Sequence, residues 1–181
     1  MRRLFVYKVL DIRKLKGGIV FILSLLSLTN INAQTSEGYF TSATIKYNAG
    51  DYNGAIKDYD KAIGLNPQYA EAYCHRGDSK NKLGDFDGAV QEYNKAISIN
   101  PKYAEAYCNR GNAKYNSGDN QGAIQEYDKA IGLNPKYAEA YFDRGNAKNK
   151  TGDRKGACSD WSKSGGLGFK QAFELIKKNC K

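Results

Sequence analysis

The residues best suited to metal or redox chemistry are four cysteines and one histidine. Cys74, Cys108, Cys158 and Cys180 include no Cys-x-x-Cys pair, and the single His75 cannot complete a zinc site with such widely spaced thiols. The chain also lacks a nucleophile elbow and a phosphate-binding glycine loop. We therefore predict no metal site, no catalytic residues, no cofactor and no small-molecule substrate, and we expect that the protein is not an enzyme.

These residues are set within a 34-residue unit that occurs four times. The phrase Asn-Pro-x-Tyr-Ala-Glu-Ala-Tyr recurs, and its prolines are Pro67, Pro101 and Pro135, each 34 residues after the last. The units aligned on these prolines are residues 36–69, 70–103, 104–137 and 138–169. Such a period is typical of solenoids, in which each unit buries its apolar faces against its neighbours.

Within each unit, the pattern predicts two helices joined by a short turn. Apolar residues recur at i, i+3 and i+7 in the second helix, as in Ile56, Tyr59 and Ile63. The pair Gly50-Asp51 and its equivalents supply a glycine for a positive φ and an aspartate to cap the second helix. Each proline ends the unit, because it forces the preceding Asn out of helical geometry. We expect the glutamates of the second position in the first turn of the first helix of each unit, where the helix dipole favours a negative charge. These are Glu37, Glu71, Glu105 and Glu139.

The recurring residues resemble those of the tetratricopeptide repeat family, whose 34-residue unit is a helix, a turn and a second antiparallel helix. The matching positions carry an aromatic residue at the fourth and twenty-fourth, a small residue at the eighth, alanine at the twentieth and twenty-seventh, and proline at the thirty-second. Ser164 and Phe169 depart from this pattern in the fourth unit. The resemblance implies an all-α, right-handed superhelical solenoid of antiparallel helix pairs.

The end of the chain, residues 170–181, predicts a helix that caps the solenoid. Phe169, Ala172, Phe173, Ile176 and Cys180 recur at helical spacing and would face inward. Cys158 takes the place of a core Ile or Val of the other units, so Cys158 and Cys180 could form a disulfide that holds the cap in an oxidising compartment. The alternative is two buried thiols.

The other two cysteines are not expected to pair. Cys74 and Cys108 share the fifth position of adjacent units, and a helix spacing of about 8–10 Å puts them beyond disulfide reach.

Three arginines at the seventh position are candidates for ion pairs between units. The first unit, which has no predecessor, carries Ser42 there instead. We therefore predict that each arginine reaches back to the acid at the twenty-third position of the preceding unit. The predicted pairs are Arg76 with Asp58, Arg110 with Glu92 and Arg144 with Glu126.

In tetratricopeptide proteins the first helices line a concave groove, so the resemblance implies a protein or peptide partner bound there. The resemblance places the second, fifth, ninth, twelfth and thirteenth positions on this groove. The last four of these carry over to partner-binding residues Phe40, Thr44, Tyr47, Cys74, Asp78, Asn81, Lys82, Cys108, Asn112, Tyr115, Asn116, Phe142, Asn146, Asn149 and Lys150. Amide and tyrosine side chains suit hydrogen bonding to an extended backbone. The alternative is that the amides are ordinary solvated surface. The fifth position is never basic, unlike that of the family's chaperone-binding members, so a partner gripped by its terminal carboxylate is not expected.

Residues 1–33 have the layout of a secretory signal. Basic residues precede an apolar stretch at residues 19–28, and Ala33 offers a cleavage point. The apolar stretch is only about half of the ~20 residues that a membrane span needs. We predict export to the periplasm or outside the cell, cleavage after Ala33, and membrane contact only during export. An uncleaved anchor that tethers the chain to the membrane is the alternative.

The net charge of +9 does not indicate a nucleic-acid partner. Residues 1–33 hold six of the 28 basic residues and one of the 19 acidic residues, which leaves 22 and 18 in the rest of the chain. These charges alternate in sign, so we expect no phosphate-binding stripe and no nucleic acid. The sequence predicts an exported interaction scaffold that binds a polypeptide in its groove. The alternative is a structural subunit of a cell-envelope complex, assembled through convex or terminal surfaces.

Overall fold

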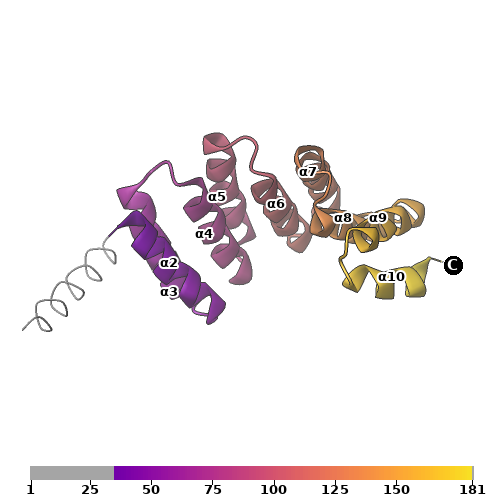
Figure 1. The fold of residues 1–181 in the computed structure, drawn as a ribbon, viewed down its shortest axis with the longest axis horizontal. Coiled ribbons are helices and arrows are strands. Elements are labelled where there is room, and N and C mark those ends of the chain that lie inside the picture. The colour runs from indigo at the N-terminus through magenta and orange to yellow at the C-terminus, as the bar shows by residue number, and fades with distance from the viewer. Residues whose placement is uncertain (1–34, 181) are drawn as a thin grey trace, which may run out of the picture.

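The computed structural model describes residues 35–180, and the predicted export signal lies outside them. Over this range the chain forms nine helices and no strand (Figure 1). The helices are α2 (Ser36–Asn48), α3 (Tyr52–Leu65), α4 (Ala70–Lys82), α5 (Phe86–Ile99), α6 (Ala104–Asn116), α7 (Asn120–Leu133), α8 (Ala138–Lys150), α9 (Arg154–Gly166) and α10 (Gln171–Asn179). None of these described helices combines the length and the apolar composition that a membrane crossing requires.

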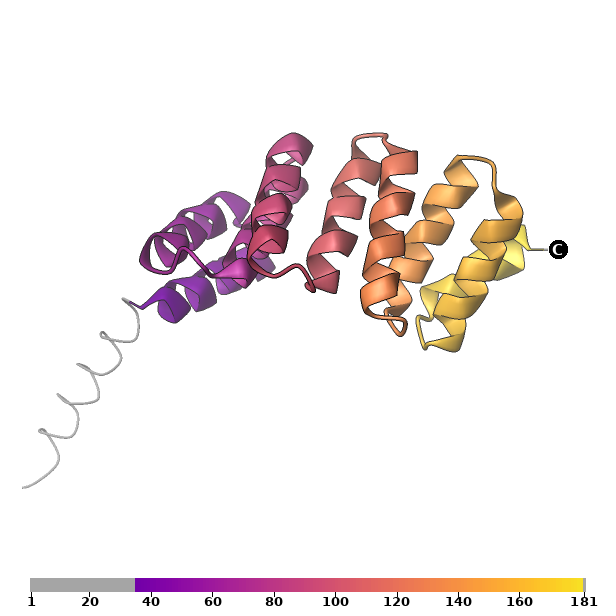
Figure 2. The ribbon, with the colours of Figure 1, turned by 90° about the horizontal axis from the view of Figure 1, so that it is seen from above.

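Consecutive helices pack in pairs, and the pairs follow one another along the long axis of the molecule (Figures 1 and 2). Each first helix packs against its own second helix, and each second helix packs against the next first helix. The first helices α2, α4, α6 and α8 also touch one another in sequence, as expected on the inner side of a curved stack. The predicted all-α solenoid with a C-terminal capping helix is confirmed.

The turn inside each unit is built by three residues rather than the predicted two. Gly50 has a φ of 82°, and Asp51 then accepts a hydrogen bond from the Gly54 backbone N–H at 2.8 Å. A Cβ at Gly54 would lie 1.9 Å from Asp51 Oδ2, so only glycine leaves room for this cap. The same arrangement recurs before α5, α7 and α9, which explains why every unit begins its second helix at the same point.

The core of each unit is an aromatic ring laid against a small residue. Tyr93 and Tyr127 are fully buried, as are the alanines around them. A Cβ at Gly111 would lie 2.7 Å from Tyr127 Cε1, so glycine at the eighth position permits close contact between the ring and the first helix. Trp161 takes the same place against Gly145 in the fourth unit. The tyrosine-rich composition therefore reflects packing between helices.

The predicted arginine pairs Arg76–Asp58, Arg110–Glu92 and Arg144–Glu126 are wrong. Arg76 Nη2 lies 2.5 Å from Glu92 of its own unit, while Arg76 Nη1 reaches Asp60 of the preceding unit at 2.6 Å. Arg110 pairs in the same way with Glu126 and Asn94, and Arg144 with Asp160 and Asp128. The seventh and twenty-third positions face each other within one helix pair, and Ser42 shows this directly by donating to Asp58 at 2.7 Å. Each arginine still links two units, through the twenty-fifth position of the preceding one.

The C-terminal cap rests on the fourth helix pair. Helix α9 forms although Ser164 departs from the repeat pattern, and the buried Ser164 hydroxyl donates to the Ala138 carbonyl at 2.8 Å. Cys158 and Cys180 are joined in a disulfide. Ala172 is buried beside Trp161, whereas Phe173, predicted to face inward, lies over Gly165 with 55% of its surface exposed.

Candidate binding groove

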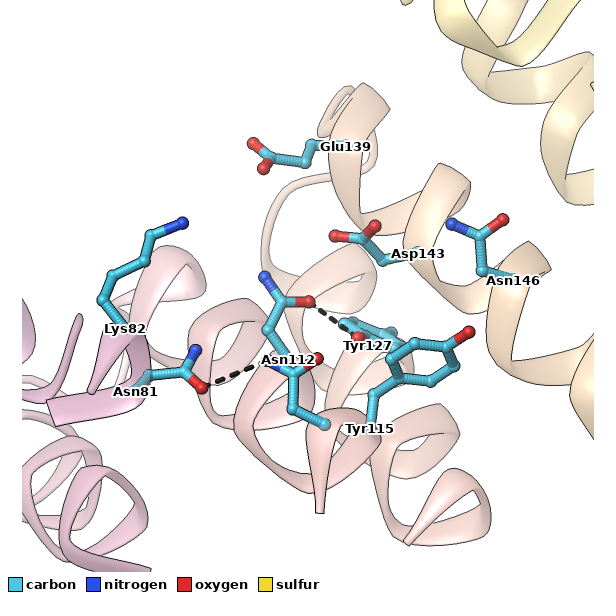
Figure 3. Close-up of a pocket in the computed structure, with 9 residues that line it drawn as sticks. Asn81, Lys82, Asn112, Tyr115, Tyr127, Glu139, Asp143 and Asn146 are labelled. Atoms are coloured by element: carbon cyan, nitrogen blue, oxygen red, sulfur yellow. Dashed lines mark hydrogen bonds between the residues drawn. The ribbon is translucent and has the colours of Figure 1, made fainter. Parts of the chain in front are cut away.

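Two adjoining hollows open on the inner side of the stack, along α4, α6 and α8. The larger, of about 280 Å³, is lined by Asn81, Lys82, Asn112, Tyr115, Asn116, Tyr127, Glu139, Asp143 and Asn146 (Figure 3). The smaller, of about 190 Å³, is lined by Tyr47, Asp78, Asn81, Lys82, Asn109, Asn112 and Glu139. Because four residues line both hollows, they form one continuous depression, which we call the groove.

Helical spacing explains which side chains reach the groove. The second, sixth, ninth and thirteenth positions follow the spacing i, i+4, i+7 and i+11 and therefore share one face of each first helix. The fourth, seventh and eleventh positions lie on the opposite face, where the arginine ion pairs form. Each first helix thus separates a solvated groove face from an ion-paired face.

Asp78 anchors the groove floor between the second and third units. Its Oδ1 accepts hydrogen bonds from Tyr93 Oη at 2.8 Å and from Asn109 Nδ2 at 2.9 Å. His75 Nδ1 lies 3.3 Å from the other carboxylate oxygen. This hydrogen bond to Asp78 raises the pKa of His75, and burial of the imidazole opposes the effect.

The next junction repeats this arrangement with acid and amide exchanged. Asn112 Oδ1 accepts from Tyr127 Oη at 2.7 Å (Figure 3). The Asn112 side chain also stabilises the charge of Asp143, since it opposes the rise in the pKa of that carboxyl. At both junctions a buried tyrosine donates a hydrogen bond to the side chain at the ninth position. This side chain in turn interacts with the side chain at the sixth position of the next unit. One carboxylate and one amide meet at each junction, which keeps donor and acceptor matched.

The groove carboxylates differ in their electrostatic setting from those of the ion-paired face. Burial, reinforced by the nearby Glu139 charge and opposed by the Asn112 hydrogen bond, raises the pKa of Asp143 to about 7. Burial also raises the pKa of Glu105, which lies at the second position of the neighbouring first helix but lines neither hollow. On the other face, burial raises the pKa of Glu126, but hydrogen bonds from Arg110 and Lys114 outweigh this and lower it overall.

The structure brings together just over half of the predicted partner-binding residues. Those that line the groove are Tyr47, Asp78, Asn81, Lys82, Asn112, Tyr115, Asn116 and Asn146. Phe40 stacks on Tyr69 beyond the N-terminal end of the groove, and Thr44 donates to the Phe40 carbonyl. Phe142 packs on Phe169 beneath the cap, and Asn149 and Lys150 are exposed at the end of α8, outside both hollows.

The prediction that Cys74 and Cys108 contact a partner is wrong. Both residues are free thiols with none of their surface exposed. Asn109 lies over Cys74, with its Nδ2 at 3.8 Å from the sulfur. Burial raises the pKa of both thiols well above the ordinary value, so neither is available as a thiolate.

Four groove residues were not predicted to contact a partner: Asn109, Tyr127, Glu139 and Asp143. Asn109 and Asp143 occupy the sixth position, which reads Thr41, His75, Asn109 and Asp143 across the four units. The residue at this position differs in every copy of an otherwise repeated unit. Such variation indicates a surface position rather than a position that packs between helices. Glu139 occupies the second position, which the family resemblance places on the groove but whose glutamates were predicted only to favour the helix dipole.

No group of His, Cys, Asp or Glu side chains within residues 35–180 is arranged to hold a metal ion. The side chains that line the groove offer hydrogen bonds, aromatic surface and negative charge.

Comparison with known proteins identifies the family of the chain. The family model described as TPR repeat matches residues 44–83, 77–118 and 111–152, which together span more than half of the sequence. The protein therefore belongs to the tetratricopeptide repeat family. No curated protein matches it significantly.

Solved structures share the same fold. The crystal structure of MamA protein is 28% identical, with a TM-score of 0.67 and coverage of 78% of each chain. The Arabidopsis OM64 TPR domain is also 28% identical, with a TM-score of 0.63 over 66% of this chain and 98% of that one. The first TPR of Spaghetti (RPAP3), bound to the HSP90 peptide SRMEEVD, is 22% identical, with a TM-score of 0.63 over 66% and 95% of the two chains.

Proposed function

We propose that the protein is an exported interaction scaffold that binds an extended polypeptide segment in the groove. The observation that carries this proposal is the continuous groove along the first helices. Five asparagines and Tyr115 are among the residues that line it. Amide side chains offer both a donor and an acceptor to a peptide backbone, and an aromatic ring anchors a side chain at low entropic cost.

The length of the groove suits a short segment. Adjacent packed helices are about 8–10 Å apart, so the distance from α4 to α8 is about 16–20 Å. An extended chain rises about 3.3 Å per residue, which gives five or six bound residues. Asn116 Nδ2 already donates to Asn81 Oδ1 at 3.1 Å across this span, so these two amides are close enough to bind neighbouring peptide groups.

Membership of the tetratricopeptide family supports a role in protein interaction. The RPAP3 domain binds its HSP90 peptide on the same fold, although its low identity to this chain carries no information about the ligand here. Export rests on the sequence of residues 1–33, with cleavage after Ala33 and release into the periplasm or outside the cell. The Cys158–Cys180 disulfide supports this location, since such bonds persist in oxidising compartments.

Affinity capture from the envelope and secreted fractions of the source cells, followed by mass spectrometry, tests the proposal. Tyr115→Ala with Asn116→Ala should lose a partner that the wild-type protein retains. Gln91→Ala with Gln125→Ala, exposed positions on the second helices, serves as the matched control and should retain it. Equal capture by both double variants would disprove binding in the groove.

The same experiment separates the groove from the alternative of assembly through terminal surfaces. A photo-crosslinker at Tyr115 should label the partner, whereas one at the exposed Phe173 should not. Labelling from Phe173 alone would instead support a structural subunit that assembles through its capping helix.

A further inference from the structure

The acids of the ion-paired face are all neutralised by the chain itself. Each of these four buried carboxylates receives a lysine from the first helix of its own unit, at 2.5 to 3.0 Å. In the last three units an arginine binds the same carboxylate. Burying a charge is costly unless it is paired, and here every charge has its partner.

The acids of the groove have no such partners. Within residues 35–180, no lysine or arginine lies within ion-pair distance of Asp78, Glu139 or Asp143. The single ion pair among them is His75 with Asp78. Lys82 lines both hollows, but its side chain is exposed. The groove is therefore lined by three carboxylates and one lysine, and Glu139 and Asp143 have no ion-pair partner within residues 35–180.

This negative charge is not a consequence of composition. Beyond residue 33 the chain has more basic than acidic residues. The arginines of the seventh position and the lysines of the eleventh position are instead directed to the opposite face of the first helices, whereas Lys82 lines the hollows. The raised pKa of Asp143 is consistent with this separation, because only the neutral amide of Asn112 stabilises its charge while Glu139 opposes it.

The geometry around Glu139 and Asp143 suits one cationic side chain. The two residues are one helical turn apart on α8, and side chains at this spacing lie about 5–6 Å from each other. Both line the larger hollow, where Asn146 and Tyr115 supply further acceptors (Figure 3). A lysine or arginine of a bound peptide would enter this hollow between two carboxylates.

We infer that the segment bound in the groove is basic, and that one of its lysine or arginine side chains pairs with Glu139 and Asp143. This inference rests on the proposed function and adds the chemistry of the partner to it. An acidic peptide is disfavoured, since it would bring like charges together in a partly buried site. A free metal ion is disfavoured as well, because no described group of side chains is arranged to hold one.

A peptide selection tests the inference with the purified protein. Displayed random peptides of about ten residues, longer than the five or six that the groove is expected to hold, are selected on the wild-type protein and counter-selected on Tyr115→Ala. Peptides that depend on the groove should be enriched in lysine and arginine and depleted in aspartate and glutamate. A dye-labelled peptide of this set should bind more weakly as salt is raised.

Variants then locate the charge. Asp143→Asn should weaken binding of the labelled peptide by about tenfold or more, since it removes a partly buried charge partner. Glu139→Gln, at an exposed position, should weaken binding by about two- to fivefold, as expected for an exposed ion pair. Glu174→Gln, at an exposed acid on α10, is the control and should change affinity less than twofold, about the effect of a distant surface charge. Circular dichroism of each variant shows that the fold is retained.

The outcomes distinguish failure of the basic partner from failure of the proposed binding in the groove. Groove-dependent peptides that are acidic or uncharged, or whose affinity is unchanged by Asp143→Asn and Glu139→Gln, would overturn the basic partner and leave the groove in place. If no selected peptide were lost on Tyr115→Ala, the groove itself would be refuted, and the basic partner with it.

Discussion

Replacing Asn109 with aspartate should destabilise the junction between the second and third units, and a second change should repair it. Asn109 Nδ2 donates to Asp78 Oδ1 at 2.9 Å, so Asn109→Asp places two carboxylates in contact. Adding Asp78→Asn restores one acid and one amide with their positions exchanged. The next junction already has this exchanged order, with Asn112 at the ninth position and Asp143 at the sixth.

The size of the effect follows from the contact. A hydrogen bond to a charged group contributes about 1.5–3 kcal/mol. Two charges about 4 Å apart repel by about 4 kcal/mol at an effective dielectric constant of ~20. The destabilisation cannot exceed the cost of protonating one of the two carboxyls, because protonation removes the repulsion. This cost is about 4 kcal/mol at pH 7 for an acid with an ordinary pKa of about 4. We expect the free energy of unfolding to fall by about 2–4 kcal/mol at pH 7.

The penalty should depend on pH in a defined direction. The shared site raises the folded-state pKa of the paired acids above the unfolded value. The penalty is therefore absent below about pH 4, where the unfolded acids are protonated too, and it grows as the pH rises. At pH 5 it should be no more than about 1.5 kcal/mol.

Urea unfolding followed by far-UV circular dichroism, at pH 5 and pH 7, measures these differences. Asn53→Asp, at an exposed position of α3, is the matched control and should change stability by no more than about 0.5 kcal/mol. The reasoning fails if Asn109→Asp is as stable as the wild type at pH 7, or if Asp78→Asn does not restore the double variant.

Three further effects follow from the structure. Asp143→Asn should raise the free energy of unfolding by on the order of 2–4 kcal/mol at pH 7 and leave it unchanged near pH 4, because the raised pKa of Asp143 makes its ionisation unfavourable in the fold. The ionisable groups that line the hollow with it are Glu139, Lys82, Tyr115 and Tyr127. Urea unfolding across this pH range checks the sign, and a constant difference would contradict it. Cys158→Ser should cost about 3 kcal/mol, from loss of a cross-link between residues 22 apart, and hydrogen exchange should rise mainly in α10. Gly118→Ala should lower stability by about 1 kcal/mol because of its φ of 95°, and since no atom lies within 4 Å of the added Cβ, thermal unfolding should show no larger loss.

The sequence was sufficient for the helix pairs because their signals are local and repeated. A Gly-Asp pair ends one helix and caps the next, and an Asn-Pro pair closes each unit, so four copies indicate the same fold four times. The third turn residue, Gly54 and its equivalents, could have been found in the same way. Its requirement became apparent only from the position of a Cβ against Asp51.

The residues of the groove were predicted less completely than the helix pairs. The positions carried over from the family indicate which residues face the groove, but not how deeply each side chain is buried. Cys74 sits at a nominal groove position, yet Asn109 from the next unit covers it. Asn109 and Asp143 reach the groove because the next first helix brings the sixth position over the preceding ninth position. This overlap depends on how neighbouring units are rotated against each other.

The sequence by itself determined the period, the helix boundaries and the turns, since these arise from backbone preferences of residues close together in the chain. The tertiary structure alone decided which charges are paired. From the spacing in sequence, Arg76 could have paired with an acid of its own unit or with one of the preceding unit. Only the packing of α4 between α3 and α5 shows that it pairs with Glu92 and with Asp60. The same packing directed the arginines of the seventh position and the lysines of the eleventh position to one face and left Glu139 and Asp143 of the groove without ion-pair partners among the described residues, because the distance between charges on different helices is set by packing rather than by their separation in sequence.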